Sequence, residues 1–321
     1  MRAWCIENEQ LQLNTLPAPS PGPEDILVQV KAVGLNRADL LQVKGLYPAP
    51  PGTSSRVPGL EYAGEVIAVG ERVQQRKVGD AVMGLVPGCA YAEQIVSHER
   101  EALTIPAGLD FARAVTLPEA FLTAYRALFL EGGLQPGQWC LIRPATAGVG
   151  LAATQLAHIL GARPIGSSRD PRKLDSAVAM GLAARVTEDG TLAEQLTSLT
   201  DQQGVAVMLD MVGPDWNTLL GGLRPEGTLV MIGMLGGMTT ELNLGALLMR
   251  RQTLKTMTMR SQPLENRIRM AQIFNDRLAP LFAEGSLRPL PLETFAFEQA
   301  PAAQAHMAGD DFSGKRVLVL D

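Results

Sequence analysis

Short segments in which apolar residues run together or alternate with polar ones make up the first third of the chain. Stretches rich in proline and glycine, such as PAPSPGPED and PAPPGTSS, separate these segments. This spacing predicts a compact, β-barrel-like domain of short strands. The expected strands are RAWCIE at 2–7, LQLNTL at 11–16, DILVQVKAVGL at 25–35, EYAGEVIAVG at 61–70, DAVMGLV at 80–86 and AYAEQIV at 90–96.

The pattern changes near Leu117. The segment PEAFLTAYRALFL at 118–130 has helical periodicity, and from Gln138 to about Thr258 apolar strands alternate with helical segments. This alternation over roughly 120 residues predicts a parallel, doubly wound sheet and an α/β fold. We expect strands at 139–143, 162–168, 183–186, 204–213 and 227–235, and helices at 149–160, 171–180, 191–200 and 215–223.

The last part of the chain holds two predicted helices, near Asn266–Glu284 and Ala302–Met307, and a final apolar strand, KRVLVL, at 315–320. We expect this strand to return to the first domain. The alternating region would then be an insertion into that domain.

The run WCLIRPATAGVG at 139–150 carries the clearest functional pattern. An apolar strand leads into a turn of small residues, and a helix begins near Val149. The positive end of such a helix binds a pyrophosphate through backbone N–H groups, and only small residues let the phosphates approach. An ordinary strand-to-helix turn is the alternative, because alanines replace two glycines of the ideal pattern. We expect the dinucleotide contacts to come from Ala147, Gly148, Val149 and Gly150.

The end of the following strand distinguishes NAD from NADP. An NAD site places an acid there for the ribose 2′-hydroxyl, whereas an NADP site supplies cations. Here the strand ends in GSSRDPRKL, whose hydroxyl and basic groups favour a phosphate dianion. Asp170 complicates this interpretation unless it only caps the next helix, and Arg172 and Lys173 could simply form a solvated helix face. We expect NADPH, with Ser167, Ser168, Arg169 and Lys173 near its 2′-phosphate.

Composition narrows the possible partners. The chain has 321 residues, of which 46% are hydrophobic, and a formal net charge of -5 without a basic block. A nucleic-acid or membrane-surface role is therefore not expected, and no apolar run approaches the roughly 18 residues of a membrane span. Three scattered cysteines and the lack of a secretory signal favour a cytoplasmic protein.

Five segments together resemble the quinone oxidoreductase branch of the medium-chain dehydrogenase/reductase superfamily, which includes zeta-crystallin and the stress-inducible NADPH:quinone oxidoreductases. They are LNRADLLQVKGLYPAPPG at 35–52, PGLEYAGEV at 58–66, LPEAFLTAYRAL at 117–128, PATAGVGLAATQLA at 144–157 and GKRVLVL at 314–320. The resemblance implies a GroES-like β-barrel catalytic domain interrupted by a Rossmann domain, with the active site between them. It sets the expected domains at 1–118 (GroES-like), 119–258 (Rossmann, NADPH-binding) and 259–321 (return segment).

The zinc-dependent relatives bind the metal through Cys and His. This chain has Gly59-Leu60-Glu61 where those enzymes have Gly-His-Glu, and it has no CxxC pair. A catalytic zinc needs about three protein ligands. We therefore expect no metal site. The resemblance also implies a homodimer that pairs edge to edge through the last Rossmann strand, with segment 238–258 at the contact.

The resemblance further implies roles for individual residues. Asn36, Asp39 and Tyr47 match polar positions near the nicotinamide and the acceptor, although Asp39 could equally be a helix cap and Tyr47 a loop anchor. Thr123 matches a threonine close to the nicotinamide, and Lys315 could reach the cofactor or lie at the surface. Further cofactor contacts are expected at the ends of the later strands, at Val212, Gly213, Gly233 and Met234. The resemblance implies one more segment that contacts the cofactor, with Thr258 and Met259.

These expectations converge on a zinc-independent, NADPH-dependent reductase that transfers a hydride to a small hydrophobic quinone. A quinone is already electrophilic, so the protein must mainly position the reactants and supply a proton. Two alternatives stay open. One is reduction of an activated alkene, such as an enone or enoyl thioester, and the other is a nonenzymatic NADPH-binding protein.

Overall fold

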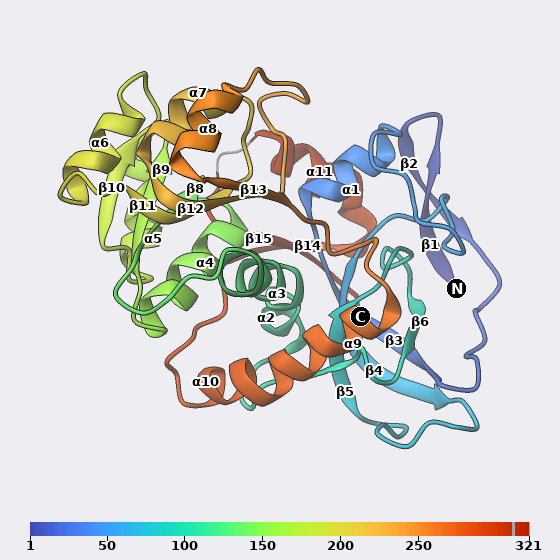
Figure 1. Cartoon of the computed structure of the whole chain (residues 1–321). Helices are drawn as coiled ribbons and strands as arrows, with labels where there is room; N and C mark the ends of the chain where they lie inside the picture. The colour runs from blue at the N-terminus through green and yellow to red at the C-terminus, as the bar shows by residue number, and fades with distance from the viewer. Residues whose placement is uncertain (310–311, 321) are drawn as a thin grey trace. The chain divides into compact units, whose positions relative to one another are not determined.

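The computed structural model describes residues 1–309 and 312–320 (Figure 1). The chain divides into two compact units, one formed by Met1–Glu119 with Met259–Asp321 and the other by Ala120–Thr258. The first unit thus contains both ends of the chain. Among the described residues, no helix combines the length and the apolar character that crossing a membrane requires.

The first unit is built mainly from antiparallel strands. A seven-stranded sheet has the order β14-β15-β3-β4-β5-β7, with β6 also paired to β3, and a two-stranded sheet joins β1 and β2. Among the described residues of this unit, only β14 and β15 pair in parallel. The strands are β1 Arg2–Glu7, β2 Gln10–Thr15, β3 Asp25–Gly34, β4 Glu61–Val69, β5 Ala81–Leu85, β6 Gln94–His98, β7 Leu103–Thr104, β14 Leu292–Ala296 and β15 Lys315–Val319.

The central strand β3 shows why this region folds as a sheet. Ile26, Val28 and Val30 are fully buried, whereas the residues between them are half-buried. This period of two places one face of the strand in the core. Strand β15 pairs antiparallel with β3. The last strand of the chain therefore lies in the sheet of the first unit.

The helices of the first unit are short, apart from one long segment after the insertion. The helix predicted near 266–284 begins two residues earlier and runs through a π-helical turn to residue 283. The elements are α1 Arg37–Val43, α2 Phe111–Ala114, α9 Leu264–Ile273, η4 Phe274–Leu278, α10 Ala279–Ala283, η5 Phe297–Gln299 and α11 Ala300–Gly309.

The second unit contains the predicted parallel sheet, with helices on both faces (Figure 1). Its strand order is β10-β9-β8-β11-β12-β13, so the direction of winding reverses between β8 and β11. The strands are β8 Trp139–Arg143, β9 Arg163–Ser168, β10 Ala184–Thr187, β11 Val205–Asp210, β12 Leu223–Met231 and β13 Thr253–Thr256. The helices are α3 Pro118–Tyr125, whose first two residues belong to the first unit, η1 Arg126–Glu131, α4 Gly148–Ile159, η2 Pro171–Leu174, α5 Asp175–Val178, α6 Leu192–Leu199, α7 Trp216–Leu219, η3 Leu220–Gly222 and α8 Leu244–Arg250.

Several element boundaries differ from the sequence prediction, among them those of one helix and one strand in the second unit. The single helix expected at 171–180 is a 3₁₀ turn followed by one short α-helix. Strand β12 begins at Leu223, four residues before the expected start. Pro225 is tolerated there because β13 pairs with β12 only from Thr228 onward and the register against β11 shifts before that residue. A missing N–H costs little where no ladder bond is made.

Strand β11 is buried along its whole length. That burial pattern is typical of a parallel strand covered on both faces. In α4, every residue from Gly150 to Ala157 is buried. Strands β8 and β11 and helix α4 therefore lie in the core of the second unit, and the turn that joins β8 to α4 is attached to that core at both ends.

Candidate functional site

The turn after β8 is the strand-to-helix turn where the sequence predicts the pyrophosphate contacts. Ala147 is the N-cap residue of α4 and makes no side-chain cap hydrogen bond. At Gly150 a Cβ atom would lie 2.8 Å from Cα of Ala145 and even closer to the carbonyl oxygen of Pro144. Only glycine fits at that position. The four residues expected to contact the diphosphate therefore lie together at a tightly packed helix start.

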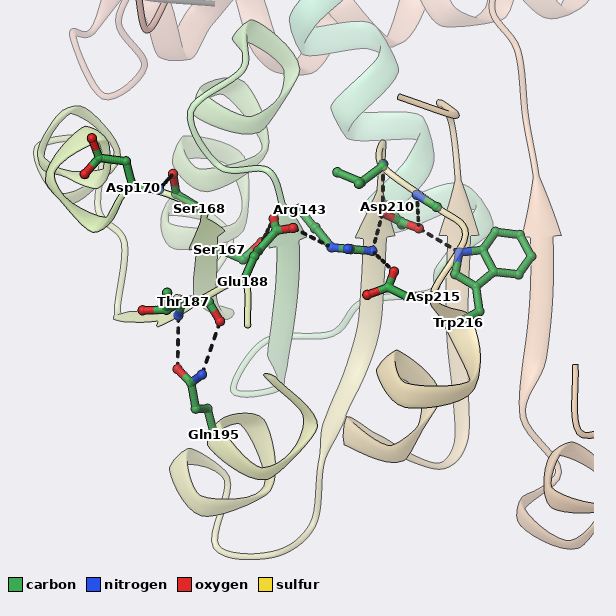
Figure 2. A network of polar contacts seen from close by, with 12 residues as sticks. Arg143, Ser167, Ser168, Asp170, Thr187, Glu188, Gln195, Asp210, Asp215 and Trp216 are labelled. Atoms are coloured by element: carbon green, nitrogen blue, oxygen red, sulfur yellow. Dashed lines mark hydrogen bonds and ion pairs between the residues drawn. The ribbon is translucent and has the colours of Figure 1, made fainter. Parts of the chain in front are cut away.

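The two serines at the end of β9 are buried and already hydrogen-bonded (Figure 2). Oγ of Ser167 donates to Oε1 of Glu188 at 2.8 Å, and Oγ of Ser168 accepts from the Asp170 N–H at 3.2 Å. Arg169 is exposed and Lys173 is half-buried. Of the four residues expected near the 2′-phosphate, the two basic ones are thus the more accessible.

Asp170 caps the turn that follows β9, which confirms the interpretation of this acid as a helix cap. Its Oδ1 accepts from the Arg172 N–H at 3.1 Å, and both carboxylate oxygens pair with the Arg172 guanidinium at 3.0 Å. These hydrogen bonds from Arg172 lower the pKa of Asp170. The acid at this strand end is therefore held as a locally paired carboxylate.

Arg143, the last residue of β8, is buried and ion-paired at the carboxyl edge of the sheet (Figure 2). Its guanidinium lies 3.2 Å from Glu188, 3.4 Å from Asp210 and 2.9 Å from Asp215. Burial acts to lower the pKa of Arg143, but the three carboxylates raise it above its ordinary value. The sequence left this arginine unexplained. Its partners show that it ties the ends of β8, β10 and β11 together.

The carboxylate of Asp210 organises the loop after β11. It accepts hydrogen bonds from the N–H groups of Val212 at 2.9 Å and Gly213 at 3.0 Å, and from the Trp216 indole at 2.8 Å. The expected cofactor contacts at Val212 and Gly213 relied on backbone groups. In this structure both N–H groups donate to Asp210, so neither is available to donate a hydrogen bond to a cofactor.

The other residues expected to contact the cofactor differ in exposure. A Cβ atom at Gly233 would lie 2.8 Å from the carbonyl oxygen of Met211, so the chain passes close to the loop after β11 there. Met234 is 46% exposed and Thr258 is also exposed. Thr123 and Met259 are buried.

In the first unit, Asn36 belongs to a buried polar cluster with Lys315 and Glu61. The Lys315 Nζ donates to Oε2 of Glu61 at 2.5 Å and to Oδ1 of Asn36 at 2.6 Å. The Asn36 amide donates to the same Glu61 oxygen at 3.1 Å, and the other Glu61 oxygen accepts from the Glu119 N–H at 2.7 Å. Of the two positions that the sequence left open for Lys315, the surface is excluded, because the residue is buried and its amine bonds Glu61 and Asn36.

Asp39 is fully buried at the start of α1. Its Oδ2 accepts from the Asn36 N–H at 2.8 Å and from the Tyr91 hydroxyl at 3.2 Å, while its Oδ1 has no hydrogen-bond partner in the described part of the chain. Burial raises the pKa of Asp39 to about 7, although the Asn36 hydrogen bond and the Lys315 charge act to lower it. The residue thus serves as the cap that the sequence offered as one alternative.

Tyr47 lies half-buried in the loop after α1. The guanidinium of Arg260 lies 5.1 Å from the centre of its ring and donates to its carbonyl oxygen at 3.1 Å. The first unit therefore holds Asn36, Asp39 and Tyr47 on and around α1. Sequence reasoning missed Glu61 as the partner of Asn36 and Tyr91 as the partner of Asp39. The only indication in the sequence was the acid retained in Gly59-Leu60-Glu61.

Within residues 1–309 and 312–320, no three His, Cys, Asp or Glu side chains form a group that could hold a metal ion. Cys140 is fully buried in β8, and burial raises the pKa of its thiol to about 12. It therefore behaves as the small hydrophobic residue that the sequence predicted.

Comparison with known proteins identifies the family. The family model described as "Alcohol dehydrogenase GroES-like domain" matches residues 22–126, and the one described as "Zinc-binding dehydrogenase" matches residues 148–274. A quinone oxidoreductase of Pseudomonas aeruginosa is 33% identical over 314 residues, covering 97% of this chain and 96% of that protein. The chain belongs to the quinone oxidoreductase branch of the medium-chain dehydrogenase/reductase superfamily. It is therefore an oxidoreductase of that family, as the sequence motifs predicted.

Solved structures of the family support the same fold. A quinone oxidoreductase of Pseudomonas syringae has a TM-score of 0.90 at 31% identity and 99% coverage of both chains. An Escherichia coli quinone oxidoreductase complexed with NADPH has a TM-score of 0.88 at 27% identity and 100% coverage of both. The CurK enoyl reductase has a TM-score of 0.87 at 26% identity and covers 100% of this chain and 99% of its own. These likenesses confirm the predicted GroES-like and Rossmann architecture.

Proposed function

We propose that the protein is a zinc-independent, NADPH-dependent reductase that transfers a hydride to a small hydrophobic quinone. The observation that carries this proposal is the turn at Ala147–Gly150, where the start of α4 is packed so closely that no side chain fits at Gly150. A dinucleotide site in a chain of the quinone oxidoreductase branch favours this reaction over others. The E. coli relative whose structure is titled as an NADPH complex supports the choice of cofactor.

Three features of the second unit support NADPH over NADH. Arg169 and Lys173 present positive charge after β9. The nearest acid in the sequence, Asp170, is paired with Arg172. A 2′-phosphate would therefore meet cations rather than a free carboxylate, which is the arrangement that NADP sites use.

The proposed chemistry requires little of the protein beyond positioning and proton supply. Bound NADPH would supply the hydride from its nicotinamide ring. The Tyr47 hydroxyl would donate a hydrogen bond to a quinone oxygen, and its ring offers a flat apolar surface. Asn36, held by Lys315 and Glu61, would keep a fixed orientation beside the reactants.

Independence from zinc is part of the proposal and rests on the residues present. Leu60 stands where the zinc-dependent relatives have histidine. Glu61 has one carboxylate oxygen on Lys315 and Asn36 and the other on the Glu119 N–H. Neither residue supplies a ligand that a catalytic zinc would need.

A second candidate is reduction of an activated alkene, which the likeness to the CurK enoyl reductase favours. Both reactions use the same hydride donor, but the proton goes to carbon in the alkene and to oxygen in the quinone. A protein that binds NADPH without turnover is the third candidate.

Steady-state kinetics with purified protein separate these candidates. We expect NADPH oxidation with 1,4-benzoquinone and larger quinones, weaker oxidation of NADH, and full activity after dialysis against a chelator with no stoichiometric zinc by elemental analysis. Turnover of enones without turnover of quinones would replace the proposal by its alternative. Binding of NADPH with no turnover of either class would make the protein a nonenzymatic binder.

We also propose that the protein is a homodimer. Strand β13 is paired only with β12 in the described chain, and the adjacent helix α8 exposes Leu244, Leu248 and Met249 at 70%, 76% and 78%. A second copy pairing through this edge would cover these side chains. Light scattering should give twice the chain mass, and Leu248→Asp with Met249→Asp should give the monomer mass. A monomeric parent protein at micromolar concentration would refute this part of the proposal.

A further inference from the structure

Arg260 is a buried cation whose protein contacts are all neutral. It is 5% exposed. Its Nε donates to the Pro87 carbonyl oxygen at 2.6 Å, its Nη2 to Oε1 of Gln42 at 2.9 Å and its Nη1 to the Tyr47 carbonyl oxygen at 3.1 Å. None of these partners in the described part of the chain is a carboxylate. Burying an arginine with no carboxylate in direct contact is costly, so a benefit elsewhere must offset the cost.

The three hydrogen bonds connect three separate parts of the first unit. Gln42 lies on α1, Pro87 lies in the turn after β5, and Tyr47 lies in the loop after α1. Arg260 also stacks on the Tyr47 ring, with 5.1 Å between the guanidinium carbon and the ring centre. A planar guanidinium can satisfy all these partners at once, whereas a lysine ammonium on its flexible stem cannot.

The loop that carries Tyr47 has little other support. Residues 47–52 include three prolines, which have no N–H group. Arg260 reaches this loop from a segment about 200 residues later in the chain through its bond to the Tyr47 carbonyl oxygen, whereas the Thr53 N–H bond to the Pro50 carbonyl oxygen is local.

The packing around Gly88 shows how closely these parts meet. A Cβ atom there would lie 2.7 Å from Cγ2 of Thr53 and 3.5 Å from Nη2 of Arg260. The end of the loop, the turn after β5 and the guanidinium are therefore in close contact, and Arg260 fills the space between them.

We propose that Arg260 is a positioning residue that holds Tyr47 and its loop in place for the electron acceptor. It acts through Tyr47, so its loss changes the affinity for the acceptor and leaves the affinity for NADPH unchanged. The inference rests on the proposed function, because it takes Tyr47 as an acceptor contact. Its physical part, the attachment of residues 44–54 by Arg260, can be measured without any substrate.

Two variants and a matched control test the proposal in the full-length protein. Arg260→Lys keeps the charge but loses the planar fork, and Arg260→Met loses both. Arg250→Lys is the control, because Arg250 also donates to three backbone carbonyl oxygens, at Leu220, Gly221 and Leu223, in the second unit. Hydrogen exchange of residues 44–54, the Kd for NADPH and the KM and kcat for 1,4-benzoquinone are measured for each.

Both Arg260 variants should exchange faster at 44–54 and raise the quinone KM by about tenfold or more, since small misplacements of a positioning group have large effects. Their Kd for NADPH should stay within about twofold of the parent value, and Arg250→Lys should change none of these quantities. Unchanged exchange at 44–54, or faster exchange with an unchanged quinone KM, would overturn the proposal. If the parent protein reduces no quinone, the proposed function fails, and the exchange data alone decide whether Arg260 holds the loop.

Discussion

The Nζ atom of Lys315 lies 2.5 Å from Oε2 of Glu61, and the two side chains are 5% and 0% exposed. Lys315 opens the last strand of the chain, and Glu61 opens β4. The pair therefore bonds the C-terminal segment to the N-terminal strands inside the first unit. It also holds the Asn36 amide, which connects the stability of this unit to the candidate acceptor site.

Removing one partner of this pair should destabilise the protein strongly. Lys315→Met and Glu61→Gln should each lower the free energy of unfolding by about 3–5 kcal/mol, because each leaves a buried polar or charged group without its partner. Urea unfolding measures the effect. Arg251→Met is the control, since the Arg251–Glu226 pair is 65% and 69% exposed and should be worth at most about 1 kcal/mol. Equal losses for the buried and exposed pairs would contradict this account.

Gly150→Ala should disrupt the turn at Ala147–Gly150, where we propose that the dinucleotide binds. The added methyl group would lie 2.8 Å from Cα of Ala145, so the turn or the helix start must move. We expect the Kd for NADPH, followed by fluorescence titration, to rise by about tenfold or more, because the diphosphate relies on the position of these backbone groups. Gly190→Ala is the matched control, as no atom lies within 4 Å of a Cβ atom there. Tight NADPH binding by Gly150→Ala would move the cofactor site elsewhere.

Replacing the cations after β9 should change cofactor preference. Arg169→Gln and Lys173→Gln should each raise the KM for NADPH by about tenfold, the value of one charged hydrogen bond to a phosphate. The KM for NADH should hardly change, because NADH has no 2′-phosphate. Arg185→Gln serves as a control, since Arg185 pairs with Asp175 and is 42% exposed. Parallel losses with both cofactors would show that these cations do not read the phosphate.

Asp39 should make the stability of the protein depend on pH. Its pKa is raised from 3.8 to about 7 by burial, so between these values the folded protein holds a proton that the unfolded chain releases. The free energy of unfolding should therefore fall as pH rises across this interval. Asp39→Asn keeps an oxygen that can accept from Asn36 and Tyr91 but does not titrate.

Urea unfolding of the parent protein and Asp39→Asn between about pH 4.5 and 8 tests this prediction. The variant should gain stability relative to the parent as pH rises, and the gain should level off above about pH 7. Two parallel profiles would mean that Asp39 is ionised throughout and that its unpaired Oδ1 has a partner in solution.

Local patterns in the sequence predicted the architecture of both units. The short apolar or alternating segments of the first third, β3 among them, predicted a domain of short strands, and the alternation of strands and helices after residue 138 predicted a parallel sheet. The structure has both. The turn of small residues after β8 predicted the start of α4 to within one or two residues. Asp170 was recognisable as a possible cap because capping depends on neighbours two or three residues away.

Contacts between distant segments decided the chemistry of the individual side chains. Nothing near Ser167 indicates that its hydroxyl meets Glu188, and nothing near Lys315 indicates that its amine meets Glu61 and Asn36. The Val212 and Gly213 N–H groups point at Asp210 for the same kind of reason. Backbone conformation and burial follow from short-range preferences that a sequence displays directly. The partner of a buried charge depends on which strands the fold brings together, and that is settled only when the whole chain has packed.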